Sequence, residues 1–181
     1  MADNSKDGAI DTSAAEAFEK YLVPTIFGPW SEAIIDHAST KESHNLLDVG
    51  CGSGAAARYA AKIVGLTGSV SAIDFNAGMI THARTLDPVG QIDWQQGDVT
   101  DMPYDDGVFD IIAGNQLLQF LPEKEKGLSE MKRVLADSGR LALTVYCAPH
   151  RNPAHAAVAN ALEKHGIDSK GVVHPFSYGD P

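Results

Sequence analysis

Residues 46–54 read LLDVGCGSG, an apolar run that contains Asp48 and leads into glycines at positions 50, 52 and 54. The run has the length of a buried strand, and the residues after it, AAARYAAKIV, have the composition of a helix. Glycines in such a turn adopt backbone angles closed to other residues and let a ligand approach the main chain. The first N–H groups of the helix attract a carboxylate or a phosphate. The stretch predicts a ligand-binding turn, with a tight turn that binds nothing as the alternative.

The same alternation of short apolar runs and helical stretches continues along the chain. Strands are predicted at 45–49, 69–74, 91–95, 108–114 and 139–146, and helices at 54–65, 76–86, 123–136 and 153–165. This order is typical of an α/β protein with a Rossmann-like, doubly wound and mainly parallel sheet. Right-handed crossovers place the loops that follow the strands along one edge, where such sheets bind ligands.

The regions on either side of this core differ from it in composition. Residues 1–12 are polar and are expected to form a disordered tail, whereas 13–44 hold two helical stretches, the first of which Pro24 should end or kink. Residues 45–146 form the α/β core, and 147–181 hold one helix and a tail. We therefore expect one domain with a helical N-terminal cap.

Composition restricts the kinds of partner. The chain of 181 residues has 24 acidic and 14 basic residues and a formal net charge of −10, which disfavours binding to nucleic acid or to an anionic membrane. No apolar run suggests a signal peptide or a membrane span, and two distant cysteines fit a reducing compartment. These features favour a cytoplasmic protein that binds a neutral or cationic small molecule.

Two further acids stand at predicted strand ends. Asp74 closes the second strand, twenty residues after Gly54, where nucleotide-binding sheets place the acid that accepts hydrogen bonds from ribose hydroxyls. The alternative for Asp74 is a helix cap. Asp98 follows the third strand, so with Asp48 three acids are expected in a row along the ligand edge.

Four stretches together resemble the class I S-adenosylmethionine-dependent methyltransferases, in particular the small-molecule branch that includes quinone-biosynthesis C-methyltransferases. They are LLDVGCGSG, SAIDFNAGMITHAR, QGDVTDMPYDDGVFDIIAGNQLLQF and LSEMKRVLADSGRLALTV, and the resemblance runs without a gap from about residue 46 to 146. It implies the strand order 3-2-1-4-5 and S-adenosyl-L-methionine as cofactor, with S-adenosyl-L-homocysteine as product. It also implies in-line methyl transfer to a small-molecule acceptor.

The resemblance also implies roles for individual residues. The residues implied at the cofactor are Asp48, Gly50, Cys51, Gly52, Gly54, Asp74, Phe75, Met79, Gly97, Asp98, Val99, Asn115 and Gln116. Within this set, Asp48 would place the amino group, Asp74 the ribose and Asp98 the adenine edge. Tyr21, Phe27 and Trp30 would be lid contacts, with core packing as the alternative. No residue is identified as a catalytic base, and no histidine shows metal-ligand spacing.

The C-terminal part is shorter than the family pattern. Family members usually continue after the fifth strand with a helix and two more strands, one of them antiparallel beside strand five. That hairpin is expected to be missing here, which would expose the fifth-strand edge and leave open a homodimer formed through it.

Two other functions stay open. One is a noncatalytic or incomplete S-adenosylmethionine-binding module. The other is an NAD-dependent oxidoreductase, because Gly50, Gly52 and Ala55 fit a relaxed dinucleotide fingerprint. Asp48 argues against the oxidoreductase because it would repel a nearby pyrophosphate.

Overall fold

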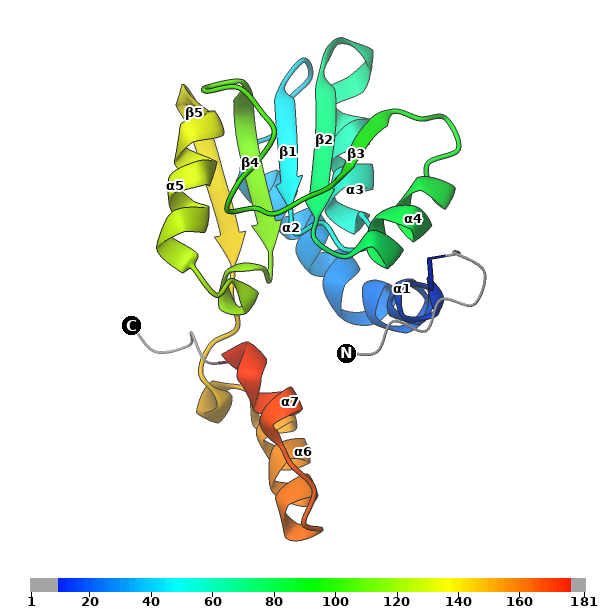
Figure 1. The fold of residues 1–181 in the computed structure, drawn as a ribbon, viewed down its shortest axis with the longest axis vertical. Helices are drawn as coiled ribbons and strands as arrows, with labels where there is room; N and C mark the ends of the chain where they lie inside the picture. Colours follow the sequence, from blue (N-terminus) through cyan, green and yellow to red (C-terminus); the bar gives the residue numbers. More distant parts are fainter. Residues whose placement is uncertain (1–9, 177–181) are drawn as a thin grey trace.

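The computed structural model describes residues 10–176 and shows one five-stranded sheet (Figure 1). Its strands are β1 (Asn45–Val49), β2 (Ser69–Asp74), β3 (Ile92–Gln96), β4 (Phe109–Asn115) and β5 (Leu135–Thr144). The strand order is β3-β2-β1-β4-β5 and every neighbouring pair is parallel. The Rossmann-like topology expected from the sequence is confirmed, and the carboxyl ends of all five strands lie at the same edge.

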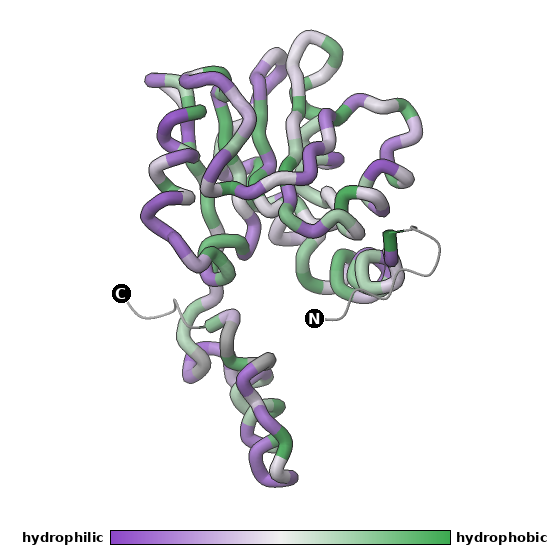
Figure 2. The backbone as a smooth tube through the Cα atoms, viewed as in Figure 1, coloured by the Kyte–Doolittle hydropathy of each residue, from purple (hydrophilic) through white to green (hydrophobic). Residues whose placement is uncertain are grey.

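Helices cover both faces of this sheet. Contacts place α2 (Gly28–His37), α3 (Ala55–Val64) and α4 (Ala77–Thr85) on one face, and α5 (Lys124–Val134) packs on the other (Figure 1). Successive strand residues alternate between the two cores, so Leu46 packs under α2 and α3 while Leu47 packs on the α5 side. Figure 2 shows the central strands as mostly hydrophobic and α5 as mostly hydrophilic. This pattern is typical of a parallel sheet buried on both sides.

The N-terminal helices differ from the prediction at Pro24. The helix does not end there: α1 (Ser13–Ala17) continues as a π-helix, η1 (Phe18–Phe27), which leads directly into α2. The wider π-turn carries the chain past the proline, since the N–H of Gly28 donates to the carbonyl of Val23 five residues earlier. The hydroxyl of Thr25 donates to the Tyr21 carbonyl at 2.7 Å. The helix therefore continues through Pro24, and of the two predicted effects of this proline, an end of the helix is wrong.

The fifth strand begins earlier than predicted. Leu135 pairs with Phe109, and regular pairing resumes at Arg140 with Ile111, so a register shift precedes the stretch predicted from the sequence. Two short 3₁₀ helices also lie before β5, η2 (Gly65–Thr67) and η3 (Leu118–Phe120).

After β5 the chain forms η4 (Pro149–Arg151), α6 (Pro153–Lys164), α7 (Lys170–Val173) and η5 (His174–Phe176). α6 and α7 extend away from the sheet as an arm (Figure 1). The rings of Tyr146, His155 and Phe176 pack together at the base of the arm, with centroids 4.8–5.8 Å apart. Among the described residues no helix is long and apolar enough to cross a membrane.

Candidate functional site

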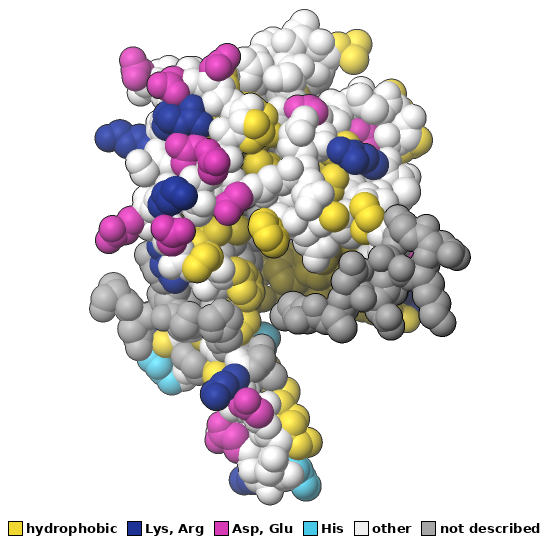
Figure 3. All heavy atoms as spheres, viewed as in Figure 1, with side chains coloured by type: hydrophobic (Ala, Val, Ile, Leu, Met, Phe, Trp, Pro, Cys, Tyr) yellow, Lys and Arg dark blue, Asp and Glu magenta, His cyan; other side chains and the backbone are white. Residues whose placement is uncertain are grey.

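A cavity of about 820 Å³ opens at the carboxyl ends of the strands, beneath the N-terminal helices. Hydrophobic side chains surround the hollow in this part of the surface (Figure 3). The volume lies within the range of small-molecule sites. The sequence-predicted residues that line it are Phe27, Asp48, Gly50, Cys51, Gly52, Asp74, Phe75, Met79, Asp98, Val99, Asn115 and Gln116. The structure thus brings together residues from both sides of the sheet edge and from the N-terminal helices.

The three glycines of the loop after β1 have different surroundings. All three have a positive φ, but a Cβ at Gly52 would meet only Phe18, 3.7 Å away across the cavity. A Cβ at Gly54 would collide with the ring of Trp94, and Gly54 does not line the cavity. Gly54 is therefore required for packing of the loop on β3, whereas Gly50 and Gly52 stand at the cavity surface.

Asp48 is buried at the floor of the cavity, with only 1% of its surface exposed. Its Oδ2 accepts a hydrogen bond from the N–H of Ala57 in the first turn of α3, at 3.0 Å. Burial raises the pKa of Asp48 to about 7, against the opposing effect of the Ala57 hydrogen bond. Burial also raises the pKa of the neighbouring Cys51 thiol. The site therefore holds a carboxyl group that can change its charge near neutral pH.

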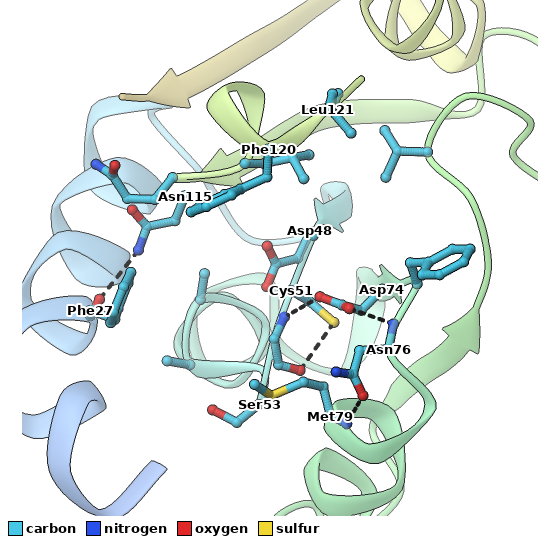
Figure 4. Close-up of a pocket in the computed structure, with 18 of the residues that line it drawn as sticks. Phe27, Asp48, Cys51, Ser53, Asp74, Asn76, Met79, Asn115, Phe120 and Leu121 are labelled. Atoms are coloured by element: carbon cyan, nitrogen blue, oxygen red, sulfur yellow. Dashed lines mark hydrogen bonds between the residues drawn. The ribbon is translucent and has the colours of Figure 1, made fainter. Parts of the chain in front are cut away.

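Asp74 joins β2 to the glycine loop. Its Oδ2 accepts the N–H of Gly52 and its Oδ1 accepts the N–H of Asn76, both at 2.8 Å (Figure 4). The cap of α4 is Asn76, whose Oδ1 accepts from Gly78 at 2.8 Å and from Met79 at 3.2 Å. The helix-cap alternative for Asp74 is thus wrong. An ionised carboxylate with two oxygens still has lone pairs for a ligand.

The end of β3 supplies Asp98 and Val99 to the cavity wall. Asp98 Oδ1 accepts the N–H of Thr100 at 2.8 Å, and this bond holds the pKa of Asp98 below its usual value. Gly97 does not line the cavity; a Cβ there would lie 2.8 Å from Ile73 Cδ1, so its small size serves packing against β2.

The N-terminal helices form the cover of the cavity, which we call the lid (residues 13–37). The rings of Phe18 and Phe27 pack at 4.8 Å and both line the cavity. Asn115 Nδ2 tethers the lid to β4 by donating to Ser31 Oγ at 3.1 Å and to the Phe27 carbonyl at 3.3 Å. Tyr21 and Trp30 are 60% and 53% exposed and do not line the cavity. Of the three predicted lid contacts, the structure places only Phe27 at the site.

A second tether joins the lid to the glycine loop. Glu19 accepts hydrogen bonds from the Ser53 hydroxyl at 2.6 Å and from Arg58 Nη2 at 2.7 Å. Ser53 is buried and lines the cavity. Any movement of the lid away from the loop must break this partly buried ion pair.

Sequence reasoning missed several cavity residues. Those not anticipated are Phe18, Ser31, Ser53, Ala55, Ala56, Asn76, Thr100, Leu117, Phe120, Leu121, Pro122 and Glu123. The apolar run LLQFLP at 117–122, which follows β4 at the ligand edge, was a usable indication, although Leu118 and Leu121 of this run also belong to the core on the α5 side. No group of three His, Cys, Asp or Glu side chains in residues 10–176 is placed to hold a metal ion.

Residues 47–143 match the protein family described as "Methyltransferase domain". The chain is 31% identical over 125 residues to a 2-phytyl-1,4-naphtoquinone methyltransferase of Nostoc sp., covering 67% of this chain and 55% of the relative. It is 30% identical over 128 residues to a ubiquinone/menaquinone biosynthesis C-methyltransferase of Psychromonas ingrahamii, covering 68% and 51%. The chain thus spans about half the length of these curated relatives.

A solved structure shows the same fold. The crystal structure of a SAM-dependent methyltransferase from Aquifex aeolicus superposes with a TM-score of 0.65 at 27% identity, over 75% of this chain and 72% of that one.

Proposed function

Because the chain belongs to the S-adenosylmethionine-dependent methyltransferases, we propose that it transfers the methyl group of S-adenosylmethionine to a quinone-type small molecule. The observation that carries this proposal is the composition of one cavity. Acids at three strand ends line one part of it, and aromatic and aliphatic side chains from the lid and from the segment after β4 line another.

The chemistry of the acidic half fits S-adenosylmethionine. The first N–H groups of α3, at Ala55 and Ala56, lie at the cavity and suit the cofactor carboxylate, while Asp48 suits its amino group. Asp74 stands at the end of β2, where its free lone pairs would accept hydrogen bonds from the ribose hydroxyls. Phe75 and Met79 then flank the adenine.

At the end of β3, Asp98 and the backbone of Val99 face the adenine edge. Gly50, Cys51, Gly52 and Asn115 complete the cofactor contacts that we propose, and Gln116 stands beside them, near the methyl group to be transferred. Gly54 and Gly97 support these contacts from behind the wall, through packing.

The apolar half fits a ring-shaped acceptor. Phe18, Phe27, Leu117, Phe120 and Leu121 line it, and none of these side chains carries a charge. Apolar walls exclude water from the reacting atoms. The bound cofactor supplies an activated methyl group on a sulfonium, so the chain contributes alignment of the acceptor and exclusion of water; alignment alone is worth roughly 7–11 kcal/mol.

No cavity residue stands out as the general base. The titratable side chains in the described lining are Asp48, Cys51, Asp74, Asp98 and Glu123. Asp48 already accepts a backbone N–H group of α3 and Asp74 one of the glycine loop, and burial keeps Cys51 a neutral thiol. This arrangement favours an acceptor that is nucleophilic by itself, such as the ring carbon of a quinol.

The geometry of the cavity also bears on the two other functions. A dinucleotide would place its pyrophosphate on the glycine loop directly above Asp48, which disfavours the NAD-dependent oxidoreductase. The noncatalytic binding module has the same cofactor half and differs only in lacking turnover.

The proposal also includes a cytoplasmic location, which the net charge and the two unpaired cysteines support. It further includes a homodimer formed through the edge of β5, a strand that pairs only with β4 among the described residues.

A methyl-transfer assay tests the proposal. S-adenosylmethionine with a labelled methyl group is incubated with the chain and a panel of reduced quinones that lack one ring methyl group, with phenols and amines as comparison acceptors. Label in the quinones supports the proposal. Label only in a comparison acceptor contradicts the acceptor class, and tight cofactor binding without label transfer favours the binding module.

A further inference from the structure

Gln116 has an unusual backbone conformation at the cavity. Its φ is 60°, in the left-handed region that side chains other than glycine rarely adopt. Its N–H donates to the carbonyl of Thr144 at 3.1 Å and to Thr144 Oγ1 at 3.0 Å, which fixes the residue to the end of β5. Strained positions that the surrounding structure holds in this way are concentrated at functional sites.

The side chain of Gln116 is held from one end only. It is 7% exposed and lines the cavity, and its Oε1 accepts a hydrogen bond from Gln119 Nε2 at 2.9 Å. A glutamine amide has one carbonyl oxygen and one NH₂ group. With the oxygen engaged, the NH₂ group of Gln116 donates no hydrogen bond to another of residues 10–176.

Gln119 is buried behind Gln116 and does not line the cavity. It is 2% exposed, and its own Oε1 has no hydrogen-bond partner in the described part of the chain. An unpaired buried amide oxygen is unfavourable, and an apolar side chain of the same size would avoid it. The contact that Gln119 does make decides which end of the Gln116 amide is free.

We propose that Gln116 donates a hydrogen bond from its NH₂ group to an oxygen atom of the methyl acceptor, and that Gln119 is the positioning residue that directs this amide. The inference rests on the proposed function and adds the polar contact that the apolar half otherwise lacks. The neighbouring amide, Asn115, is already engaged, because it donates to Ser31 and Phe27 and accepts from Thr144 Oγ1 at 2.6 Å.

The same arrangement predicts the chemistry of the ligand. A free NH₂ group prefers a carbonyl or an ionised hydroxyl oxygen and gains nothing from a hydrocarbon ring. Phe120 and Leu121 would contact the ring while Gln116 fixes its rotation through the oxygen. The amide would thereby select which ring carbon faces the methyl group.

Two matched probes separate this polar contact from general packing. 2,3-Dimethyl-1,4-naphthoquinone and 2,3-dimethylnaphthalene share a ring system, and only the first has carbonyl oxygens. Substitution at both positions prevents methylation and blocks addition of the exposed Cys147 thiol. Binding of each probe is measured by calorimetry in the presence of saturating S-adenosylhomocysteine, whose own binding is measured first.

Three variants are compared with the unmodified chain. Gln116→Met should weaken quinone binding about five- to tenfold and hydrocarbon binding less than about twofold, as expected for one lost hydrogen bond. Gln119→Met, which removes no contact to the ligand, should lower the ratio of quinone to hydrocarbon affinity about threefold. Gln91→Met, at an exposed position outside the cavity, should change neither affinity.

The outcomes separate this inference from the proposed function. The proposed amide contact is wrong if Gln119→Met weakens the binding of both probes equally, or if Gln116→Met leaves the affinity for the quinone unchanged. Binding of S-adenosylhomocysteine without binding of either ring also overturns it while leaving the cofactor assignment intact. Absence of S-adenosylhomocysteine binding overturns the proposed function itself.

Discussion

Replacing Asp74 by alanine should weaken the binding of S-adenosylhomocysteine by about 1.5–3 kcal/mol, or roughly 10- to 150-fold. Two effects contribute. The carboxylate accepts the N–H groups of Gly52 and Asn76 at 2.8 Å, so its loss loosens the glycine loop on which the cofactor would lie. The lone pairs left on the same oxygens are those proposed to hold the ribose hydroxyls, and the expected loss corresponds to about one hydrogen bond to a charged group, which is worth about 1.5–3 kcal/mol.

The matched control is Asn76→Ala, two residues away. This substitution removes the side chain that caps α4 by accepting the N–H groups of Gly78 and Met79. It should lower the free energy of unfolding by about 1 kcal/mol while leaving Asp74 in place. Calorimetric titration gives both affinities and thermal unfolding gives both stabilities. If folded Asp74→Ala binds within twofold of the unmodified chain, or if Asn76→Ala loses as much affinity, the ribose role of Asp74 is refuted.

Three other predictions concern the loop, the buried acid and the lid. Gly54→Ala should lower the free energy of unfolding by at least about 2 kcal/mol in urea denaturation, because a Cβ there meets the Trp94 ring at positive φ, whereas Gly90→Ala, with positive φ and open space, should cost about 1 kcal/mol or less. The pKa of Asp48, about 7 in the folded state and near 3.8 when unfolded, predicts that its contribution to stability falls as pH rises from about 4 to 7. Unfolding of Asp48→Asn should lack that part of the pH dependence, and an unchanged profile would contradict the burial of the acid. Glu19→Gln should weaken a partly buried ion pair, and it should therefore speed the release of S-adenosylhomocysteine about threefold and also speed amide hydrogen exchange in the lid. If both rates equal those of the unmodified chain, the lid opens without breaking this ion pair.

The strands could be predicted from the sequence because a parallel sheet buried on both faces needs short apolar runs. The stretches at 45–49 and 69–74 match β1 and β2 as predicted. The start of β5 could not be predicted in the same way. Residues 135–138 are LADS, whose assignment to a strand depends on Leu135 pairing with Phe109 across a register shift, a tertiary contact with no local pattern.

The acids of the site could be placed because each one lies at or just after the carboxyl end of a strand, and parallel strands end at one edge. The lid residues that face the cavity could not be predicted in the same way, since helical periodicity does not say which aromatic residue faces inward when the helix is wider than an α-helix. Tyr21, Phe27 and Trp30 were expected at the cofactor; the structure places Phe27 at the cavity together with Phe18 and leaves Tyr21 and Trp30 outside it.

Gly54 shows a different limit of sequence reasoning. A glycine motif does not distinguish a residue that must admit a ligand from one that must admit a neighbouring side chain. Here the neighbour is Trp94, forty residues later in the chain, and only the folded structure brings the two together.

The central claim is that the row of acids and the glycine loop form a seat for S-adenosylmethionine. The most direct measurement is a crystal structure of this chain with S-adenosylhomocysteine. We predict the ribose hydroxyls on Asp74, the adenine between Phe75 and Met79, and the homocysteine against Gly50 and Gly52. Density for the ligand elsewhere, or an empty cavity in crystals grown at saturating ligand, would contradict the account.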